Sequence, residues 1–193
     1  MSVLRAFIAI ELSEEVVAQL AALLKRLQAQ FGGGFVRWQP PHNMHLTLKF
    51  LGDVSTNQID LLADVLRTAA ADCPAFDVSV GQLGCFPKPA QPRVLWVGVQ
   101  APNALFTLQR GIENQLARLG YPPEDRPFSP HLTLGRVARQ ATPAEIRRTA
   151  DMLAQTRVGF LGAFRAGQVH LFRSDLRPSG AVYTRLFTAD LAG

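Results

Sequence analysis

Apolar residues recur along the chain at two spacings, and the two spacings alternate from segment to segment. Alternating or continuous apolar positions predict strands at 4–10, 36–38, 44–51, 76–83, 94–99, 131–137, 169–172 and 182–187. Helical spacing predicts helices from 13 to the glycines at 32–34, at 56–71, at 103–119 and from 142 onward. Ser13 and the sequence Thr-Pro-Ala-Glu at 142–145 provide residues that cap helix N-termini. Both element types therefore occur along the whole chain.

Several predicted strands follow one another through short connections, which favours antiparallel pairing. A loop with Pro87, Pro89 and Pro92 separates one such pair, and a turn at 177–180 separates the last pair. No low-complexity linker divides the chain, so residues 1–193 are predicted to form a single domain. No glycine-rich nucleotide fingerprint follows any predicted strand. We expect an α+β fold with antiparallel sheets rather than a doubly wound parallel sheet.

One tetrapeptide occurs twice, because His-Leu-Thr-Leu at 45–48 recurs at 131–134. Each copy lies on a predicted strand and follows a proline-containing turn. Since strand side chains alternate between faces, the histidine and threonine of one copy project together, roughly 6–7 Å apart, while the leucines enter the core. Two such strands facing across a groove would place two imidazoles and two hydroxyls around one small anion.

This set of groups suits phosphoryl chemistry, with His45 and His131 as the candidate catalytic residues. One neutral imidazole can take a proton from an attacking water, and one imidazolium can give a proton to the departing oxygen. The hydroxyls of Thr47 and Thr133 can donate to phosphate oxygens as negative charge builds on them. A strained cyclic phosphate needs less assistance than an open diester, so we expect no metal and no cofactor.

Two other interpretations of these histidines, a structural role and zinc binding, agree less well with the sequence. A single strand histidine is usually a hydrogen-bonded structural residue, but repetition of the whole tetrapeptide argues against that for both copies. Zinc binding would require further ligands, and no Asp, Glu or Cys stands at ligand spacing beside either copy. His42 and His170 lack the pattern and are predicted to be structural.

Composition narrows the class of protein and of partner. The hydrophobic share of 48% and charged share of 18% are those of a soluble globular protein with a substantial core. No apolar run approaches the roughly 18 residues that span a membrane, and the first residues lack a signal-peptide pattern, so we expect a cytoplasmic protein. The net charge is +5 and arginine far outnumbers lysine, which favours a polyanionic partner such as nucleic acid.

With these motifs, the chain resembles the two-histidine (2H) phosphoesterase superfamily, whose signature is a pair of His-x-Thr/Ser-x motifs. It looks most like the bacterial LigT branch of RNA 2′,3′-cyclic phosphodiesterases and 2′-5′ RNA ligases, and the resemblance covers nearly the whole chain. The segments that carry it are RAFIAI at 5–10, VRW at 36–38, HLTLKFLG at 45–52 and PFSPHLTLGR at 127–136, with Ser174, Asp175, Leu176, Gly180 and Tyr183.

The resemblance implies a fold and an activity. The fold would be bilobal, with two antiparallel sheets and their helices related by a pseudo-twofold, interlocked lobes that each supply one motif, and the active-site groove between them. The activity would be opening of an RNA 2′,3′-cyclic phosphate on the 3′-oxygen side to leave a 2′-phosphomonoester, with 2′-5′ joining as the reverse direction. Arg136 would contact the phosphate or nucleoside, and Phe7 would be a platform for a base.

The sequence leaves three points open: the roles of the two histidines, the substrate and the class of function. We favour His131 as the residue that deprotonates water and His45 as the acid, but identical motifs also allow the reverse assignment. The substrate is predicted to be an RNA 3′ end, from tRNA-like or other cleaved RNA, or a small cyclic nucleotide, bound by a monomer. The alternatives are a phosphodiesterase for another cyclic or 2′-5′-linked nucleotide, and a non-catalytic module that binds RNA ends.

Overall fold

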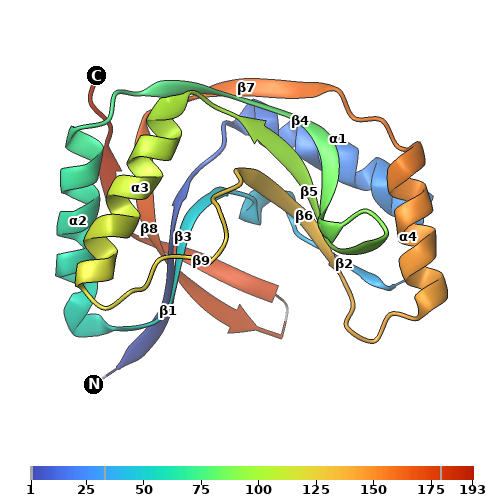
Figure 1. Ribbon diagram of the computed structural model, residues 1–193, viewed down its shortest axis with the longest axis horizontal. Coiled ribbons are helices and arrows are strands. Elements are labelled where there is room, and N and C mark those ends of the chain that lie inside the picture. Colours follow the sequence, from blue (N-terminus) through green and yellow to red (C-terminus); the bar gives the residue numbers. More distant parts are fainter. Residues whose placement is uncertain (1, 33, 179) are drawn as a thin grey trace.

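Two antiparallel sheets form the centre of the molecule (Figure 1). This computed structural model describes residues 2–32, 34–178 and 180–193, so Gly33 of the predicted helix stop and Ser179 of the predicted turn lie outside the description. Sheet A has the strand order β3-β1-β8-β9, which are Leu46–Ser55, Val3–Ile10, Gln168–Arg177 and Gly180–Asp190. Sheet B has the order β2-β6-β5-β4-β7, which are Val36–Trp38, His131–Val137, Gln91–Gln100, Phe76–Lys88 and Phe160–Ala166. The predicted α+β class with antiparallel sheets is confirmed.

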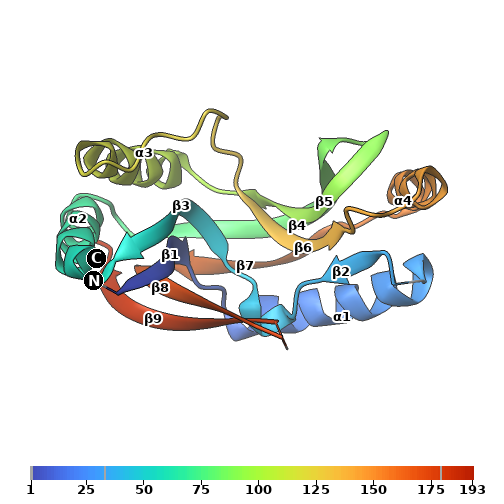
Figure 2. The ribbon, with the colours of Figure 1, turned by 90° about the horizontal axis from the view of Figure 1, so that it is seen from below.

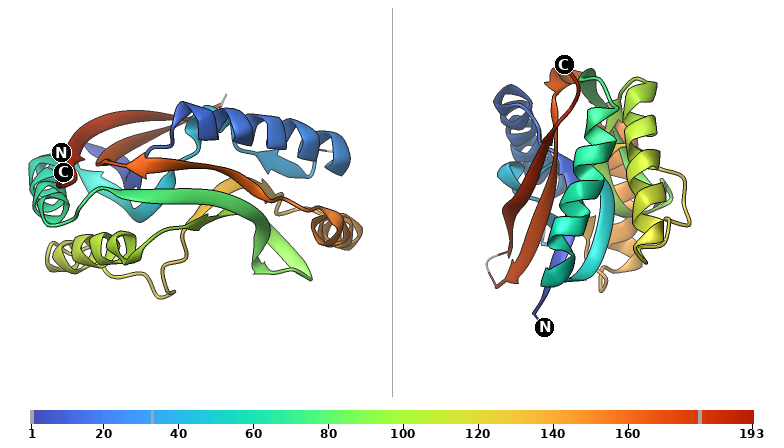
Figure 3. Two further views of the ribbon diagram at one scale, coloured as in Figure 1. Left: turned by 90° about the horizontal axis from the view of Figure 1, so that it is seen from above. Right: turned by 90° about the vertical axis from the view of Figure 1, so that its left-hand side faces the viewer.

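The α-helices of the described chain are α1 (Glu14–Phe31), α2 (Ile59–Ala71), α3 (Asn103–Arg118) and α4 (Pro143–Gln155). α1 begins where the Ser13 hydroxyl accepts a hydrogen bond from the Val16 amide, and it ends at Gly32, whose φ of +54° favours glycine. The capping box predicted at the start of α4 is present. α2 and α3 lie side by side at one end of the sheets, and α1 and α4 lie at the other end (Figure 2; Figure 3). No described helix combines the length and the apolarity needed to cross a bilayer.

The two sheets exchange strands between the halves of the sequence. β4 follows α2 along the chain but pairs with β5 in sheet B, while β8 comes late in the chain and pairs with β1 in sheet A. As a result, β3-β1-β8 in one sheet has the same arrangement as β6-β5-β4 in the other. We infer that residues 1–193 are one domain of two interlocked lobes, because neither sheet can form from one half of the chain alone.

The hairpin of β4 and β5 differs from the sequence prediction, which placed a proline-containing loop between shorter strands. The ladder continues to Lys88 and resumes at Gln91, and Pro87 stands opposite Pro92 next to a register shift. Proline removes a ladder donor but is tolerated where the pairing is irregular, so the prolines did not end the strands. The strand β7 was not predicted, because Phe160–Ala166 has too little apolar alternation to distinguish it from a loop.

The first motif also begins differently from the prediction. His45 does not lie on a strand but immediately before β3, which begins at Leu46. A short 3-10 turn, Pro41–Asn43, precedes it, and the Met44 amide donates to the Pro41 carbonyl to close that turn. Leu46 pairs with Ile10, the last residue of β1, so the ladder offers no pairing position for His45.

A buried ion pair connects β3 to the loop that leads into β6. Lys49 is 4% exposed and its ammonium group donates to a Glu113 carboxylate oxygen on α3 at 3.0 Å and to the Pro122 carbonyl at 2.6 Å. Glu113 also accepts from the Glu124 amide at 2.9 Å and from Gln109 at 3.0 Å. Burial alone raises the pKa of the Glu113 carboxyl, but these hydrogen bonds outweigh it and hold the pKa below its ordinary value. The first motif strand and the approach to the second motif are thereby fixed to one helix.

We expect Lys49→Met to lower the free energy of unfolding by about 3 kcal/mol, because it leaves the buried Glu113 carboxylate without its cation. Urea denaturation at neutral pH measures the change. Adding Glu113→Gln to that variant removes the uncompensated charge and should restore part of the loss. An unchanged unfolding midpoint for Lys49→Met would contradict the assigned stabilising role. Since the pKa of Glu113 is lowered by folding, the stabilisation is present at neutral pH and is lost on acidification.

Candidate active site

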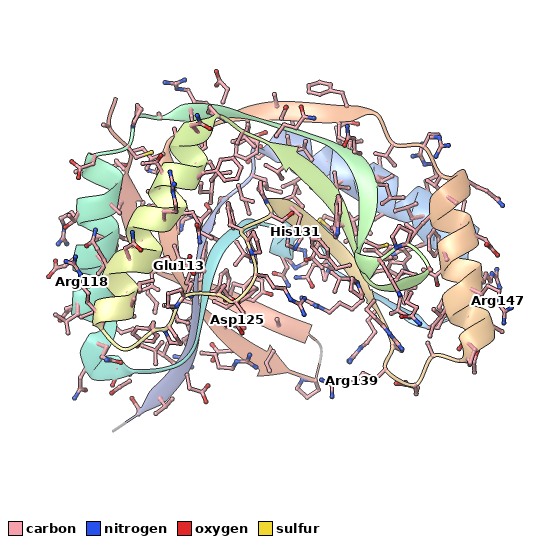
Figure 4. The ribbon with its side chains drawn as sticks, viewed as in Figure 1. Glu113, Arg118, Asp125, His131, Arg139 and Arg147 are labelled. Atoms are coloured by element: carbon pink, nitrogen blue, oxygen red, sulfur yellow. The ribbon has the colours of Figure 1, made fainter. Side chains whose placement is uncertain are left out.

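The two repeated tetrapeptides stand at the beginnings of β3 and β6, which belong to different sheets and contact one another. β3 is the edge strand of sheet A, and residues of β3 and β6 approach within 8 Å of one another between Cα atoms. Leu46, Leu48, Leu132 and Leu134 are at most 3% exposed, so all four motif leucines enter the core as predicted. The histidines and threonines of both copies are half-buried. Figure 4 shows His131 near the middle of the molecule, between the two helical ends.

Both motifs contain the same irregularity of the strand ladder. Thr47 pairs with Ala9 and Lys49 pairs with Ile8, so Leu48 is an extra residue without its own partner. In the same way, Thr133 pairs with Trp96 and Gly135 pairs with Leu95, which makes Leu134 the extra residue. A bulge of this kind shifts the side-chain alternation by one position. The sixth motif residue therefore returns to the histidine face, and this residue is Phe50 in the first copy and Arg136 in the second.

The ring of His131 is held by its own strand and by an aromatic wall. Its Nδ1 lies 2.7 Å from the Ser129 carbonyl oxygen, which can only accept, so we place the proton on Nδ1. Nε2 is then left as the atom that can accept or release a proton. The edge of the ring meets Phe86 at 5.0 Å between centroids, and Trp96 lies at 6.3 Å.

His45 is held in a corresponding way. The backbone of Asn43, again two residues before the histidine, forms a hydrogen bond with its ring. Phe7 stacks on the ring at 4.5 Å between centroids, and Tyr183 meets it edge-on at 5.3 Å. Each motif thus combines a main-chain acceptor two residues upstream with an aromatic wall, which fixes the ring orientation.

Burial lowers the affinity of both rings for a proton. Desolvation lowers the pKa of His45 to about 4, although the Asn43 backbone and the charge of Glu11 act in the opposite direction. Desolvation also lowers the pKa of His131; the Ser129 carbonyl opposes this shift, and the positive charge of Arg136 adds to it. At neutral pH both imidazoles of the free protein are therefore neutral. Their charged neighbours differ, however, since an anion lies near His45 and a cation near His131.

Comparison with known proteins agrees with this duplicated arrangement. The profile of the family described as LigT like Phosphoesterase matches the chain twice, at residues 10–96 and at residues 97–183. Each match contains one copy of the tetrapeptide. The chain belongs to this family. As a LigT-like phosphoesterase it is also a member of the two-histidine superfamily, as the motif pair indicated.

Two curated relatives cover nearly the whole chain. An RNA 2′,3′-cyclic phosphodiesterase of Methanothermobacter thermautotrophicus is 34% identical over 183 residues, which are 93% of this chain and 95% of the relative. A protein with the same name from Thermotoga maritima is 30% identical over 190 residues, covering 98% of this chain and 97% of its own.

Two solved structures show the same fold. TT0787 of Thermus thermophilus has a TM-score of 0.80 and 27% identity, with 98% of each chain covered. Escherichia coli LigT complexed with 3′-AMP has a TM-score of 0.78 and 25% identity, with both chains covered completely.

Phe7 does not have the environment that its expected role requires. Its side chain is 3% exposed, and its two stacked neighbours are His45 at 4.5 Å and Phe172 at 5.2 Å. A base cannot stack on a ring that is covered in this way, so the geometry contradicts the expectation of a free platform. Phe50 lies 6.3 Å from Phe7 and is 60% exposed, which makes it the available aromatic surface on this face. Counting alternation from His45 missed Phe50, because the bulge at Leu48 cannot be detected from sequence.

A charged network behind His45 was also missed. Glu11 forms an ion pair with Arg185, and its carboxylate lies 3.8 Å from Nε2 of His170. His170 is 2% exposed, and its Nδ1 lies 3.0 Å from the Thr188 hydroxyl oxygen, in keeping with the structural role predicted for it. Arg136 is exposed, and its effect on the pKa of His131 reflects its position on the same face. Among the described residues, no group of three or more His, Cys, Asp or Glu side chains is arranged to hold a metal ion.

We expect His45 to remain neutral down to a pH of about 4 in the free protein. NMR titration of its imidazole nitrogens measures this value. Phe7→Ala should raise the pKa towards its ordinary range, because water would then reach the face that Phe7 covers. Phe160→Ala removes an exposed ring from β7 and serves as the control, with no change expected. A midpoint near 6.5 in the unaltered protein would show that burial does not govern His45.

Proposed function

We propose that this protein hydrolyses RNA 2′,3′-cyclic phosphate ends to 2′-phosphomonoesters, using His45 and His131 as its acid and base. The observation that carries the proposal is the duplicated site: β3 and β6 approach one another, and each motif presents an imidazole that interacts with the main chain two residues upstream. The name shared by the relatives supports the choice of substrate. Because one chain supplies both motifs, we propose that it acts as a monomer. We also propose that it is located in the cytoplasm.

The proposed reaction requires only two proton transfers. One neutral imidazole takes a proton from water as the water oxygen bonds to phosphorus. The bond between phosphorus and the 3′-oxygen then breaks, and the other ring, as imidazolium, protonates that oxygen. A bound phosphate favours an imidazolium beside it, because opposite charges raise the proton affinity of the ring. Binding of the substrate can therefore promote the imidazole protonation that burial disfavours in the free protein.

We propose His131 as the base, because burial and the positive charge of Arg136 keep its ring neutral before the reaction. We propose His45 as the acid. Burial lowers its pKa to about 4 and the charge of Glu11 opposes this only in part, so protonation of His45 depends on the negative charge of the bound phosphate. We propose that the hydroxyls of Thr47 and Thr133 donate to the non-bridging phosphate oxygens. Arg136 would contact the phosphate or nucleoside, Phe50 would offer a surface to a base, and Phe7 would support the ring of His45.

We expect His45→Ala and His131→Ala each to lower kcat on an RNA ending in 2′,3′-cyclic phosphate by roughly 10²–10⁴-fold, since each removes one proton-transfer group. Affinity for the same RNA should change little. His42→Ala deletes an exposed imidazole outside both motifs and is the matched control, with activity retained. Separation of 2′- from 3′-phosphate products measures both the rate and the position of cleavage.

Three outcomes would contradict the proposal. Loss of activity in a chelator that added metal restores would rule out catalysis by two histidines alone. Binding of the RNA end without turnover in the unaltered protein would identify a binding module instead. Faster cleavage of another cyclic or 2′-5′-linked nucleotide, in a panel tested beside the RNA, would reassign the substrate.

A further inference from the structure

A group of arginines extends from Arg136 away from the phosphate site. Arg37 on β2 is the direct cross-strand partner of Arg136 on β6, and both side chains are exposed. Like charges at directly opposed positions destabilise a sheet pair, so this arrangement has a cost in the free protein. None of the ion pairs found among the described residues involves Arg37 or Arg136. An anion placed between them would remove the repulsion.

A hollow lies beside the β4–β5 hairpin, and residues that adjoin the site in sequence line it. Phe86 contacts His131, and the following residue, Pro87, lines the hollow. Val94 is the cross-strand partner of Arg136, and the preceding residue, Arg93, lines the hollow too. The hollow thus begins one residue beyond the site on both strands of the β4–β5 hairpin.

Two arginines meet at this hollow from different elements. It has a volume of about 440 Å³ and lies between the hairpin and the first turns of α4, with Arg93 on one side and Arg147 on the other. The remaining lining residues are Pro87, Ala90, Gln91, Pro143 and Ile146. Arg93 also donates to the Ala138 carbonyl at 3.4 Å, which holds its guanidinium beside the end of β6, next to the exposed Arg139. Figure 4 shows Arg139 and Arg147 on the α4 side of His131.

Negative charge is nearly absent from these segments. In 86–93 and 136–148 the basic residues are Lys88, Arg93, Arg136, Arg139, Arg147 and Arg148, and the one acidic residue is Glu145. The Glu145 carboxylate caps α4 by accepting from the Thr142 amide at 2.7 Å and from the Thr142 hydroxyl at 2.9 Å. It is therefore engaged in the cap and does not form an ion pair with the arginines. The patch keeps its positive potential for an external partner.

We propose that the RNA strand leading to the cyclic phosphate crosses this arginine patch, defined as Arg37, Arg93, Arg136, Arg139 and Arg147, and that Arg93 and Arg147 hold a backbone phosphate upstream of the reacting one. Guanidinium groups bind phosphate bidentately, and the hollow accepts a group of that size. A mononucleoside cyclic phosphate has no second phosphate to place between Arg93 and Arg147. The protein should therefore prefer oligonucleotide ends to mononucleoside cyclic phosphates, and this preference rests on the proposed function.

The test compares two double variants of equal charge change. Arg93→Ala/Arg147→Ala removes the proposed binding site for the upstream phosphate. The control, Arg110→Ala/Arg118→Ala, removes two exposed arginines from α3, on the far side of His131. The substrates are a mononucleoside 2′,3′-cyclic phosphate and an oligonucleotide with the same terminal group. We expect the first variant to lose about ten-fold in kcat/KM on the oligonucleotide only, because it loses phosphate contacts that the mononucleotide never makes. The α3 variant should match the unaltered protein on both.

The salt dependence of RNA affinity provides a second test of the proposal. Each phosphate that is neutralised on a single strand contributes roughly 0.7 to the slope of log affinity against log salt, so losing the one upstream phosphate should flatten the slope by about 0.7. Fluorescence anisotropy with an oligonucleotide ending in a 3′-phosphate measures this slope without requiring turnover. Equal slopes for the two double variants, or equal loss on both substrates, would overturn the arginine patch. Absence of turnover in the unaltered protein would refute the proposed function alone, and the anisotropy comparison would still decide whether RNA crosses the patch.

Discussion

Both halves of the site depend on how the motif strand meets its neighbour, and the decisive feature is a single unpaired leucine in each. With regular alternation after the histidine and threonine, the sixth residue of each motif would point to the opposite face. The extra residue, Leu48 in one copy and Leu134 in the other, moves that sixth side chain back to the histidine face. Both leucines are at most 3% exposed, so core packing stabilises the irregularity. Core packing of these two leucines therefore determines which side chains face the proposed phosphate site.

The main chain restrains the imidazoles in addition to this packing. A carbonyl two residues upstream fixes one nitrogen of His131, and aromatic side chains pack on both rings. The same packing removes water and lowers both pKa values, which would leave a free protein without a charged acid at neutral pH. A negatively charged substrate would raise the pKa of the imidazoles beside it, because it favours their charged form. Under the proposed function, both rings remain neutral until a phosphate binds, and protonation of the acid depends on that binding.

The motifs and the helix starts could be predicted from sequence because each depends on nearby residues. The duplicated tetrapeptide, the Ser13 cap and the box at Thr142 were all recognised from spacing alone. Features that depend on strand register were not recoverable. Neither the bulges nor the continuation of the β4–β5 ladder past Pro87 is visible until the partner strand is known. The burial of Phe7 could not be predicted for the same reason, since its cross-strand partner Phe172 lies on β8, far away in the sequence.

The two motifs are identical over four residues, so their chemical difference must come from outside the tetrapeptide. The bulge brings Phe50 to the histidine face in the first copy and Arg136 to the equivalent position in the second. Glu11 lies near the first histidine, whereas Arg136 adds positive charge near the second. Both sides of the proposed phosphate site therefore have aromatic walls, but an anion lies near His45 and a cation near His131. In the proposed mechanism a pseudo-symmetric frame thus becomes a directional site, because one ring donates a proton while the other accepts one.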